Sequence, residues 1–345
     1  MSRRYEITIE DKNGQPVGDA KGNQIGPWHS HRQERPLAGA LDIEFDIQTL
    51  GAGTIAAQSS TLVIRGLPMS VMKQSVNLSE CICTLNAGFG SIGLPLGRAQ
   101  SVHYGMILEG QIYTPYANWQ GVNQSLNLGI INYAPVLNVT GALRMDGKRG
   151  ENIGTMILRN MKAAYPGKRV VMSIADNLIL PEDTPSAEYL NMGGYSLDIG
   201  SLSRGIMNDP EYVGIQIYMQ KDFIVVSDLL YPLSGIIHNV ALEELIGQPT
   251  WEGFNSISVK VPLRSDINVG EGLRIASYTD CKIYTPYGGI GTLLTTNGGV
   301  AIVARMQDTT FSGTFIVSGI RHVGAFRNPS ADSWVSIITL TAVHK

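Results

Sequence analysis

The sequence predicts a mainly β protein with an α+β segment in its middle. Thirty-nine Gly and sixteen Pro in 345 residues, together with many Val, Ile and Thr, are typical of short strands and tight turns. Apolar residues alternate with polar ones in the first and last thirds, whereas in the middle they recur at helical spacing. The chain is too long for one compact core. We therefore expect three domains, at 1–146, 147–235 and 236–345.

The clearest strand of the first domain runs from Leu41 to Ile47. Its odd positions are apolar and its even positions are acidic, so the two kinds of side chain face opposite ways. The acidic face admits two interpretations, the solvated side of a half-buried strand or the wall of a water-filled passage that repels a polyanion. The residues concerned are Asp42, Glu44 and Asp46.

The middle domain opens after a plausible linker, Gly147-Lys148-Arg149-Gly150. Residues 151–164 have helical spacing, and the Tyr-Pro-Gly that follows predicts the end of that helix. We also expect, in the middle domain, a strand at 169–174, a hairpin at 215–226 and a weaker helix at 197–207. From residue 236 the pattern is again that of strands.

Two hairpins of similar layout lie 209 residues apart, counted from Gly110 to Gly319. In each, a strand is followed by a loop with a Pro and a Trp, and then by an alternating strand. Two similar modules in one chain can act as near-equivalent units of a ring, which favours assembly over chemistry. The loop aromatics are candidate interface anchors, with a core position and a carbohydrate platform as alternatives. They are Tyr113, Tyr116, Trp119, Phe326 and Trp334.

Charge and cysteine content exclude several classes of protein. A net charge of −3 and the absence of basic runs argue against sequence-specific binding to nucleic acid. Cys81, Cys83 and Cys281 lack the spacing of a disulfide framework, which predicts a reducing cytoplasm. The N-terminus lacks a signal peptide, and no apolar run is long enough to span a membrane.

The sequence predicts no catalytic, cofactor-binding or metal site. His29 and His31 would point apart on a strand and have no acidic or thiol partners nearby, so a surface loop is the better interpretation. A Gly-x-Ser-x-Gly motif is missing, and the adjacent Glu243 and Glu244 cannot flank one bond. The glycine stretches at 88–90 and 288–291 have no Lys-Ser/Thr tail for phosphate.

Several segments resemble, in the same order, those of phage tail baseplate hub proteins of contractile-tailed phages, both Mu-like and T-even-like. The segments in the first domain are Ala40-Leu-Asp-Ile-Glu-Phe-Asp-Ile, Leu62-Val-Ile-Arg-Gly, Gly110-Gln-Ile-Tyr and Asn118-Trp-Gln-Gly. Those in the rest of the chain are Ala164-Tyr-Pro-Gly, Gly247-Gln-Pro-Thr-Trp, Val269-Gly-Glu-Gly, Gly313-Thr-Phe-Ile-Val-Ser-Gly-Ile-Arg-His-Val-Gly and Ser333-Trp-Val.

The resemblance implies a homotrimer in which two β-barrel-like domains per chain, here 1–146 and 236–345, alternate around a ring with pseudo-sixfold symmetry. Such a ring adapts a sixfold tail tube protein to a threefold central spike protein, beside other baseplate proteins. Genome DNA passes through the lumen without specific binding, and the family has neither catalytic residues nor a cofactor. The implied location is the virion tail baseplate, assembled in the host cytoplasm without membrane insertion.

Two further expectations accompany this interpretation. Asp42, Glu44 and Asp46 are the candidate lumen-facing residues. The alternative function is a phage-derived carbohydrate-binding or cell-wall-degrading β-protein, with the Trp119 and Trp334 loops as platforms.

Overall fold

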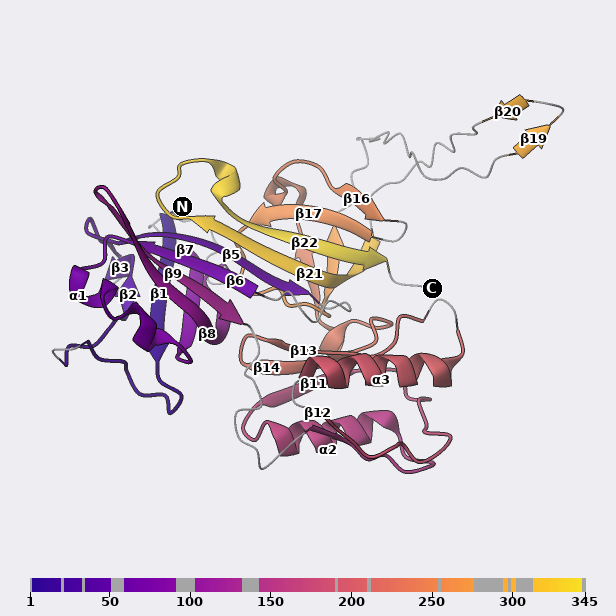
Figure 1. Cartoon of the computed structure of the whole chain (residues 1–345). Helices are drawn as coiled ribbons and strands as arrows, with labels where there is room; N and C mark the ends of the chain where they lie inside the picture. The colour runs from indigo at the N-terminus through magenta and orange to yellow at the C-terminus, as the bar shows by residue number, and fades with distance from the viewer. Residues whose placement is uncertain are drawn as a thin grey trace.

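The computed structural model is dominated by one large sheet with a smaller α+β layer beneath it (Figure 1). It confirms the expected mainly β fold with an α+β middle. The sheet has 13 strands, contributed by both ends of the chain. The structure describes residues 2–19, 22–32, 35–50, 59–90, 103–131, 143–189, 192–209, 212–253, 256–275, 294–296, 299–301 and 313–342.

Six strands of the N-terminal part form the first unit of the sheet. Their spatial order is β5-β6-β9-β8-β7-β1, and every neighbouring pair is antiparallel. Two short helical turns, α1 (Met69–Met72) and η1 (Ser75–Leu78), and the small strands β2 (Trp28–His29), β3 (His31–Arg32) and β4 (Arg35–Pro36) lie beside it. The six are β1 (Ser2–Glu10), β5 (Asp42–Leu50), β6 (Ser59–Arg65), β7 (Ile82–Gly90), β8 (Gly105–Gln120) and β9 (Asn123–Ile131).

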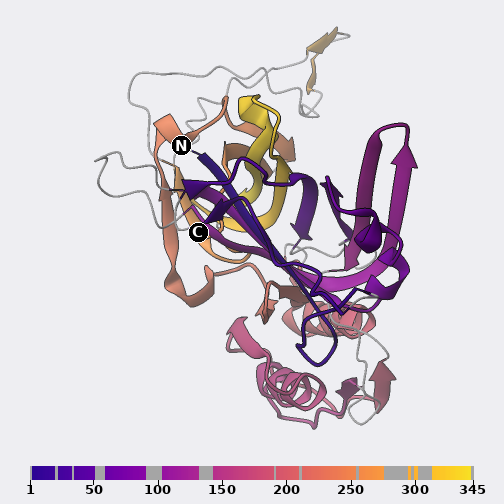
Figure 2. The same ribbon diagram turned by 90° about the vertical axis from the view of Figure 1, so that its left-hand side faces the viewer.

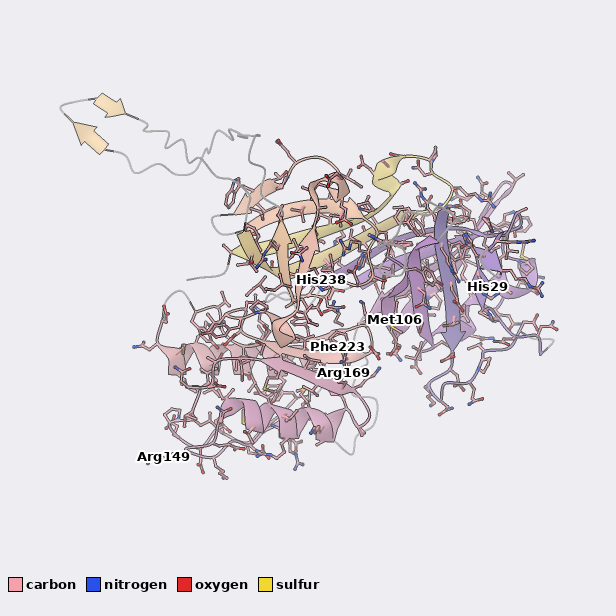
Figure 3. All side chains as sticks on the ribbon, turned by 180° about the vertical axis from the view of Figure 1, so that it is seen from behind. His29, Met106, Arg149, Arg169, Phe223 and His238 are labelled. Atoms are coloured by element: carbon pink, nitrogen blue, oxygen red, sulfur yellow. The ribbon has the colours of Figure 1, made fainter. Side chains whose placement is uncertain are left out.

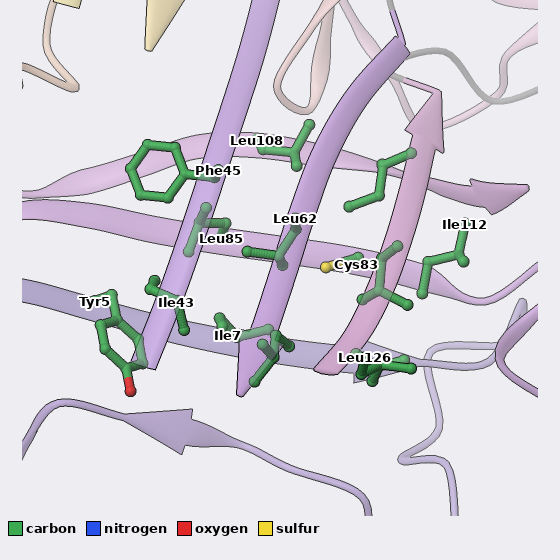
Figure 4. Close-up of a cluster of buried hydrophobic side chains, with 14 of the residues drawn as sticks. Tyr5, Ile7, Ile43, Phe45, Leu62, Cys83, Leu85, Leu108, Ile112 and Leu126 are labelled. Atoms are coloured by element: carbon green, nitrogen blue, oxygen red, sulfur yellow. The ribbon is translucent and has the colours of Figure 1, made fainter. Parts of the chain in front are cut away.

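The core of this unit follows from the alternation on β5. Ile43, Phe45 and Ile47 are at most 4% exposed, and their side chains pack against apolar side chains of the neighbouring strands (Figure 4). Cys83 belongs to the same core. The period-2 prediction for this strand is therefore confirmed.

Six strands of the C-terminal part form a second unit. Their spatial order is β16-β17-β22-β21-β18-β15, and only the last pair is parallel. Short 3₁₀ turns, η2 (Leu233–Gly235), η3 (Leu242–Glu244) and η4 (Ala331–Ser333), and the hairpin β19 (Leu294–Thr296) with β20 (Gly299–Ala301) accompany them. The six are β15 (Ile237–Val240), β16 (Thr250–Gly253), β17 (Ser256–Pro262), β18 (Gly272–Ile275), β21 (Gly313–Ala325) and β22 (Trp334–Ala342).

The two units have the same topology. Taken in chain order, β1, β5, β6, β7, β8 and β9 correspond to β15, β16, β17, β18, β21 and β22, and each takes the corresponding place in its sheet. Both long hairpins carry a register irregularity at the same level, at Tyr113 in β8 and at Ser318 in β21. The similarity expected from two hairpins thus extends over six strands. The two bulges align Tyr113 with Ser318. Gly319 therefore corresponds to Thr114, and not to Gly110 as the layout of the two hairpins suggests.

The units are fused into one sheet by β21. Its first residues, Gly313–Ile316, pair with β18, whereas Gly319–Ala325 pair with β5 of the first unit. Among the described strands, the order of hydrogen-bonded neighbours runs from β2 to β16 without returning to its start. These strands therefore form no closed barrel. The expected limits at 146 and 235 remain predictions.

The middle segment packs two helices against a small mixed sheet (Figure 1). The expected helix is present as α2 (Ile153–Ala164), where Asn152 Oδ1 accepts a hydrogen bond from Gly154 N at 2.8 Å. Gly167, at φ +93°, follows its end. The other elements are β10 (Leu143–Met145), β11 (Arg169–Ser173), β12 (Ala187–Tyr189), α3 (Met192–Met207), β13 (Gln216–Gln220) and β14 (Phe223–Ser227).

Candidate functional surface

The acidic residues of β5 share one face, opposite the core, and are paired with arginines. Arg65 on β6 places Nη1 2.8 Å from Glu44 and 3.5 Å from Asp42. Arg321 on β21 places Nη2 2.5 Å from Asp46. Three carboxylates therefore face two guanidinium groups, and the surface is close to neutral instead of strongly acidic.

These ion pairs are a feature that the sequence analysis missed. The arginines lie far from β5 in sequence and reach it only because β6 and β21 flank it. The hydrogen bond from Arg65 lowers the pKa of Glu44, so the carboxylate stays charged over a wider range of pH. All partners are partly exposed, so each pair contributes little to the free energy of unfolding.

The aromatic segment of the first hairpin is a strand, and the expected loop around Pro115 and Trp119 is wrong. β8 continues through both residues to Gln120 and turns at Gly121, which has φ +59°, directly into β9. Cross-strand pairing such as Trp119 with Gln124 keeps the segment extended. The exposed side chains are Tyr113 at 47%, Tyr116 at 54% and Trp119 at 64%.

Phe326 and Trp334 do not lie on an exposed surface. Trp334 is 1% exposed, its indole Nε1 donates to Gly88 O at 2.9 Å, and its ring meets the edge of Phe45 at 5.1 Å. Phe326 is half-buried and packs against Tyr5 at 4.9 Å. A surface-anchor or platform role is therefore wrong for Trp334, because the start of β22 places it in the core of the first unit.

The histidines near the N-terminus lie in different surroundings. His31 is buried, with Nδ1 2.8 Å from Ser30 Oγ and Nε2 3.1 Å from Ser2 Oγ, whereas His29 on β2 is exposed. Within the part of the chain that the structure describes, no group of three metal-ligating side chains comes together.

His238 on β15 lies far from His29 (Figure 3) and belongs to a buried ionic network. Its Nε2 is 2.8 Å from Glu271 and its Nδ1 is 3.5 Å from Asp266. These carboxylates raise the pKa of His238 to about 9. Burial opposes the ionisation of Asp266, but hydrogen bonds from His238 and Arg264 outweigh it and lower its pKa. A protonated imidazole held between carboxylates stabilises the fold and is poorly suited to act as a general base.

The two described thiols are equally unsuited to chemistry. Cys81 and Cys83 are buried and unpaired, and burial raises the pKa of both, to about 12 for Cys83. Cys281 and the stretch 288–291 lie outside the described residues. In the described part of the chain, no helix is long and apolar enough to cross a membrane.

The fold of this chain is similar to that of a solved tail protein. No family model matches the sequence, and no curated protein matches it. The tail protein from Neisseria meningitidis MC58 has a TM-score of 0.50 at 10% identity, covering 99% of this chain and 97% of that chain. At this identity the similarity establishes a common fold, and it confirms at that level the resemblance to phage tail proteins.

Two further solved structures are similar at lower scores. The 43 kDa tail protein of prophage MuSo2 from Shewanella oneidensis has a TM-score of 0.48 at 7% identity, covering 99% of this chain and 98% of that chain. A chain of the Francisella PdpA–VgrG complex has a TM-score of 0.43 at 8% identity, covering 98% of this chain and 52% of that chain.

Proposed function

We propose that this chain is the structural hub of a phage-type tail baseplate and works as a homotrimer. The observation that carries the proposal is the pair of six-strand units with one strand order, on a fold similar to that of a tail protein. Three chains supply six such units. Their ring is near-sixfold towards a tail tube protein and strictly threefold towards a central spike protein.

A passive role in genome ejection fits the surface chemistry. The β5 face carries Asp42, Glu44 and Asp46 with Arg65 and Arg321 interleaved, so it offers no cluster of unpaired cations to hold a polyanion. We infer that this face borders the lumen and that DNA slides past it without specific binding. The proposal includes contacts to other baseplate proteins, assembly in the host cytoplasm and no catalytic activity.

The proposal is tested by the mass of the particle in solution. Mass photometry and light scattering of the whole chain should give a species of about three times 37.3 kDa, alone or with tube and spike partners. A strictly monomeric protein in all of these mixtures would contradict a hub.

A carbohydrate-binding role is separated from the hub role by a glycan array and a turbidity assay on cell walls. Burial of Trp334 removes one of the two expected platforms, and Trp119 remains. The hub proposal predicts no signal in either assay.

A further inference from the structure

The two long strands β8 and β21 differ in what lies along their outer edges. The first part of each pairs with a shorter neighbour, β7 for β8 and β18 for β21. Beyond the bulge, β21 pairs with β5 over Gly319–Ala325. The matching part of β8, Thr114–Gln120, pairs with β9 on one side, and no other described strand lies along its second edge.

The helical turn η1 contacts β8, but this edge lacks charged protection against pairing with another chain. From Tyr113 to Val122 it carries no charged residue, whereas exposed edges are commonly guarded by Lys or other charges. Its side chains are exposed on both faces, and Val122 at the tip is 95% exposed. Edge strands with exposed aromatics favour pairing with a further strand.

The strand that corresponds to β5 in the second unit is β16. It ends the sheet, pairing with β17 alone among the described strands. Figure 1 shows β16 on the opposite side of the large sheet from the tip of the β8–β9 hairpin, and Figure 2 shows that hairpin projecting from the first unit. One copy therefore offers β16 as an edge strand, and the next copy offers the unpaired edge of β8.

The register between β16 of one copy and β8 of the next follows from which residues are paired across the strands within each unit. In the second unit Thr250, Ser258, Thr339 and Gly319 lie at one level. In the first unit the same level holds Asp46, Thr61, Gly129 and Thr114. Thr250 thus corresponds to Asp46, and Thr114 corresponds to Gly319.

Within the chain, Asp46 lies opposite Val323, the fourth residue after Gly319. The fourth residue after Thr114 is Asn118, so Thr250 should lie opposite Asn118. Trp251, which packs against the core of its own unit, then lies opposite Ala117. The pairing lies C-terminal to Pro115, which has no N–H to donate.

We propose that β16 of one copy pairs antiparallel with Tyr116–Asn118 on β8 of the next copy, with Thr250 opposite Asn118. This inference rests on the proposed trimeric hub and names the strands that hold it together. Three contacts between chains then repeat the β5–β21 contact within each chain. A head-to-tail contact generates a ring when its rotation closes, and the proposed trimer requires closure after three copies.

Cysteine cross-linking tests the register. In a Cys281→Ser background, the double variant Asn118→Cys, Thr250→Cys places two exposed thiols directly opposite each other, about 5 Å apart at Cβ. Mild oxidation should convert most of the protein into a covalent trimer on non-reducing gels. The matched control, Ala117→Cys, Thr250→Cys, shifts one thiol to the other face of the strand and should cross-link at least tenfold less.

The single variants decide the type of contact. A head-to-tail contact predicts no covalent dimer from Asn118→Cys alone, and a dimer when the two single variants are mixed. A dimer from Asn118→Cys alone indicates a symmetric contact and overturns the inference. Mass photometry on the same samples separates the two proposals. A trimer without the cross-link overturns the contact and leaves the hub, whereas a monomer throughout overturns both.

Discussion

The hairpins β8–β9 and β21–β22 have the same pairing and the same bulge but opposite surroundings. In β21, which pairs with β5, His322 is 3% exposed, and burial together with the charge of Lys221 lowers its pKa to about 3. In β8 the corresponding residue, Ala117, is exposed. The comparison teaches that the topology of a hairpin does not determine its burial, which depends on whether a neighbouring strand covers its edge.

The largest effect expected from this comparison is at Trp334. Trp334→Ala removes a buried ring from the core of the first unit and its hydrogen bond to Gly88, and should lower the free energy of unfolding by about 3–5 kcal/mol. Trp119→Ala, on the uncovered hairpin, should change it by less than about 0.5 kcal/mol. Urea denaturation of both variants, at the same protein concentration as the unmodified chain, measures both changes. Equal losses would show that the two hairpins are equally embedded.

A smaller loss is expected at Gly324, which lies opposite Phe45 where β5 covers β21. A Cβ there would overlap the Phe45 ring, so Gly324→Ala should cost about 1–3 kcal/mol. The corresponding position on β8 is Trp119, a large side chain, which is tolerated because no described strand of the same chain lies opposite. Thermal unfolding followed by circular dichroism checks the loss. An unchanged melting temperature would mean that β5 and β21 are not in close contact.

The parallel strand β15 is a departure of the second unit from the first, and His238 ties it to Glu271 beside β18. The folded-state pKa of about 9 exceeds the ordinary 6.5, so this stabilisation is complete below about pH 6.5 and is lost as pH rises through 9. Unfolding midpoints should fall between pH 7 and 10. His238→Gln should flatten that part of the profile, and an unaltered profile would contradict the network.

The smallest effect is expected at the seam between the units. Arg321→Gln breaks the exposed pair with Asp46 and should cost between about 0 and 1 kcal/mol. A double-mutant cycle with Asp46→Asn isolates the coupling. A coupling well above 1 kcal/mol would mean that this pair is more sheltered than its exposure indicates.

Local pattern predicted much of this fold. The alternation at 41–47 and the helical spacing at 151–164 correspond to β5 and α2, because each depends on side chains that are close in sequence. The aromatic segment of β8 was misread as a loop because Pro115 and polar neighbours favour turns locally. In the structure, the pairing of this segment with β9 outweighs the local preference for a turn.

The features that depend on strand order could not be predicted. The arginines beside Asp42 and Asp46 come from β6 and β21, and Trp334 enters the core of the first unit from the far end of the chain. The repeat of six strands cannot be recognised in the sequence beyond the two hairpins, because the two units share strand pairing and bulges and not residue identities. Such features require the order in which strands from both ends of the chain assemble.

The most direct test of the account is a cryo-electron microscopy reconstruction of the assembled chain viewed along its axis. We expect a closed ring of three chains in which the two six-strand units alternate, giving density that nearly repeats every sixth of a turn. The β5 face with Asp42, Glu44 and Asp46 should line the lumen. A ring in which this face is buried between subunits or lies on the outer wall, or a particle without near-sixfold repetition, would contradict it.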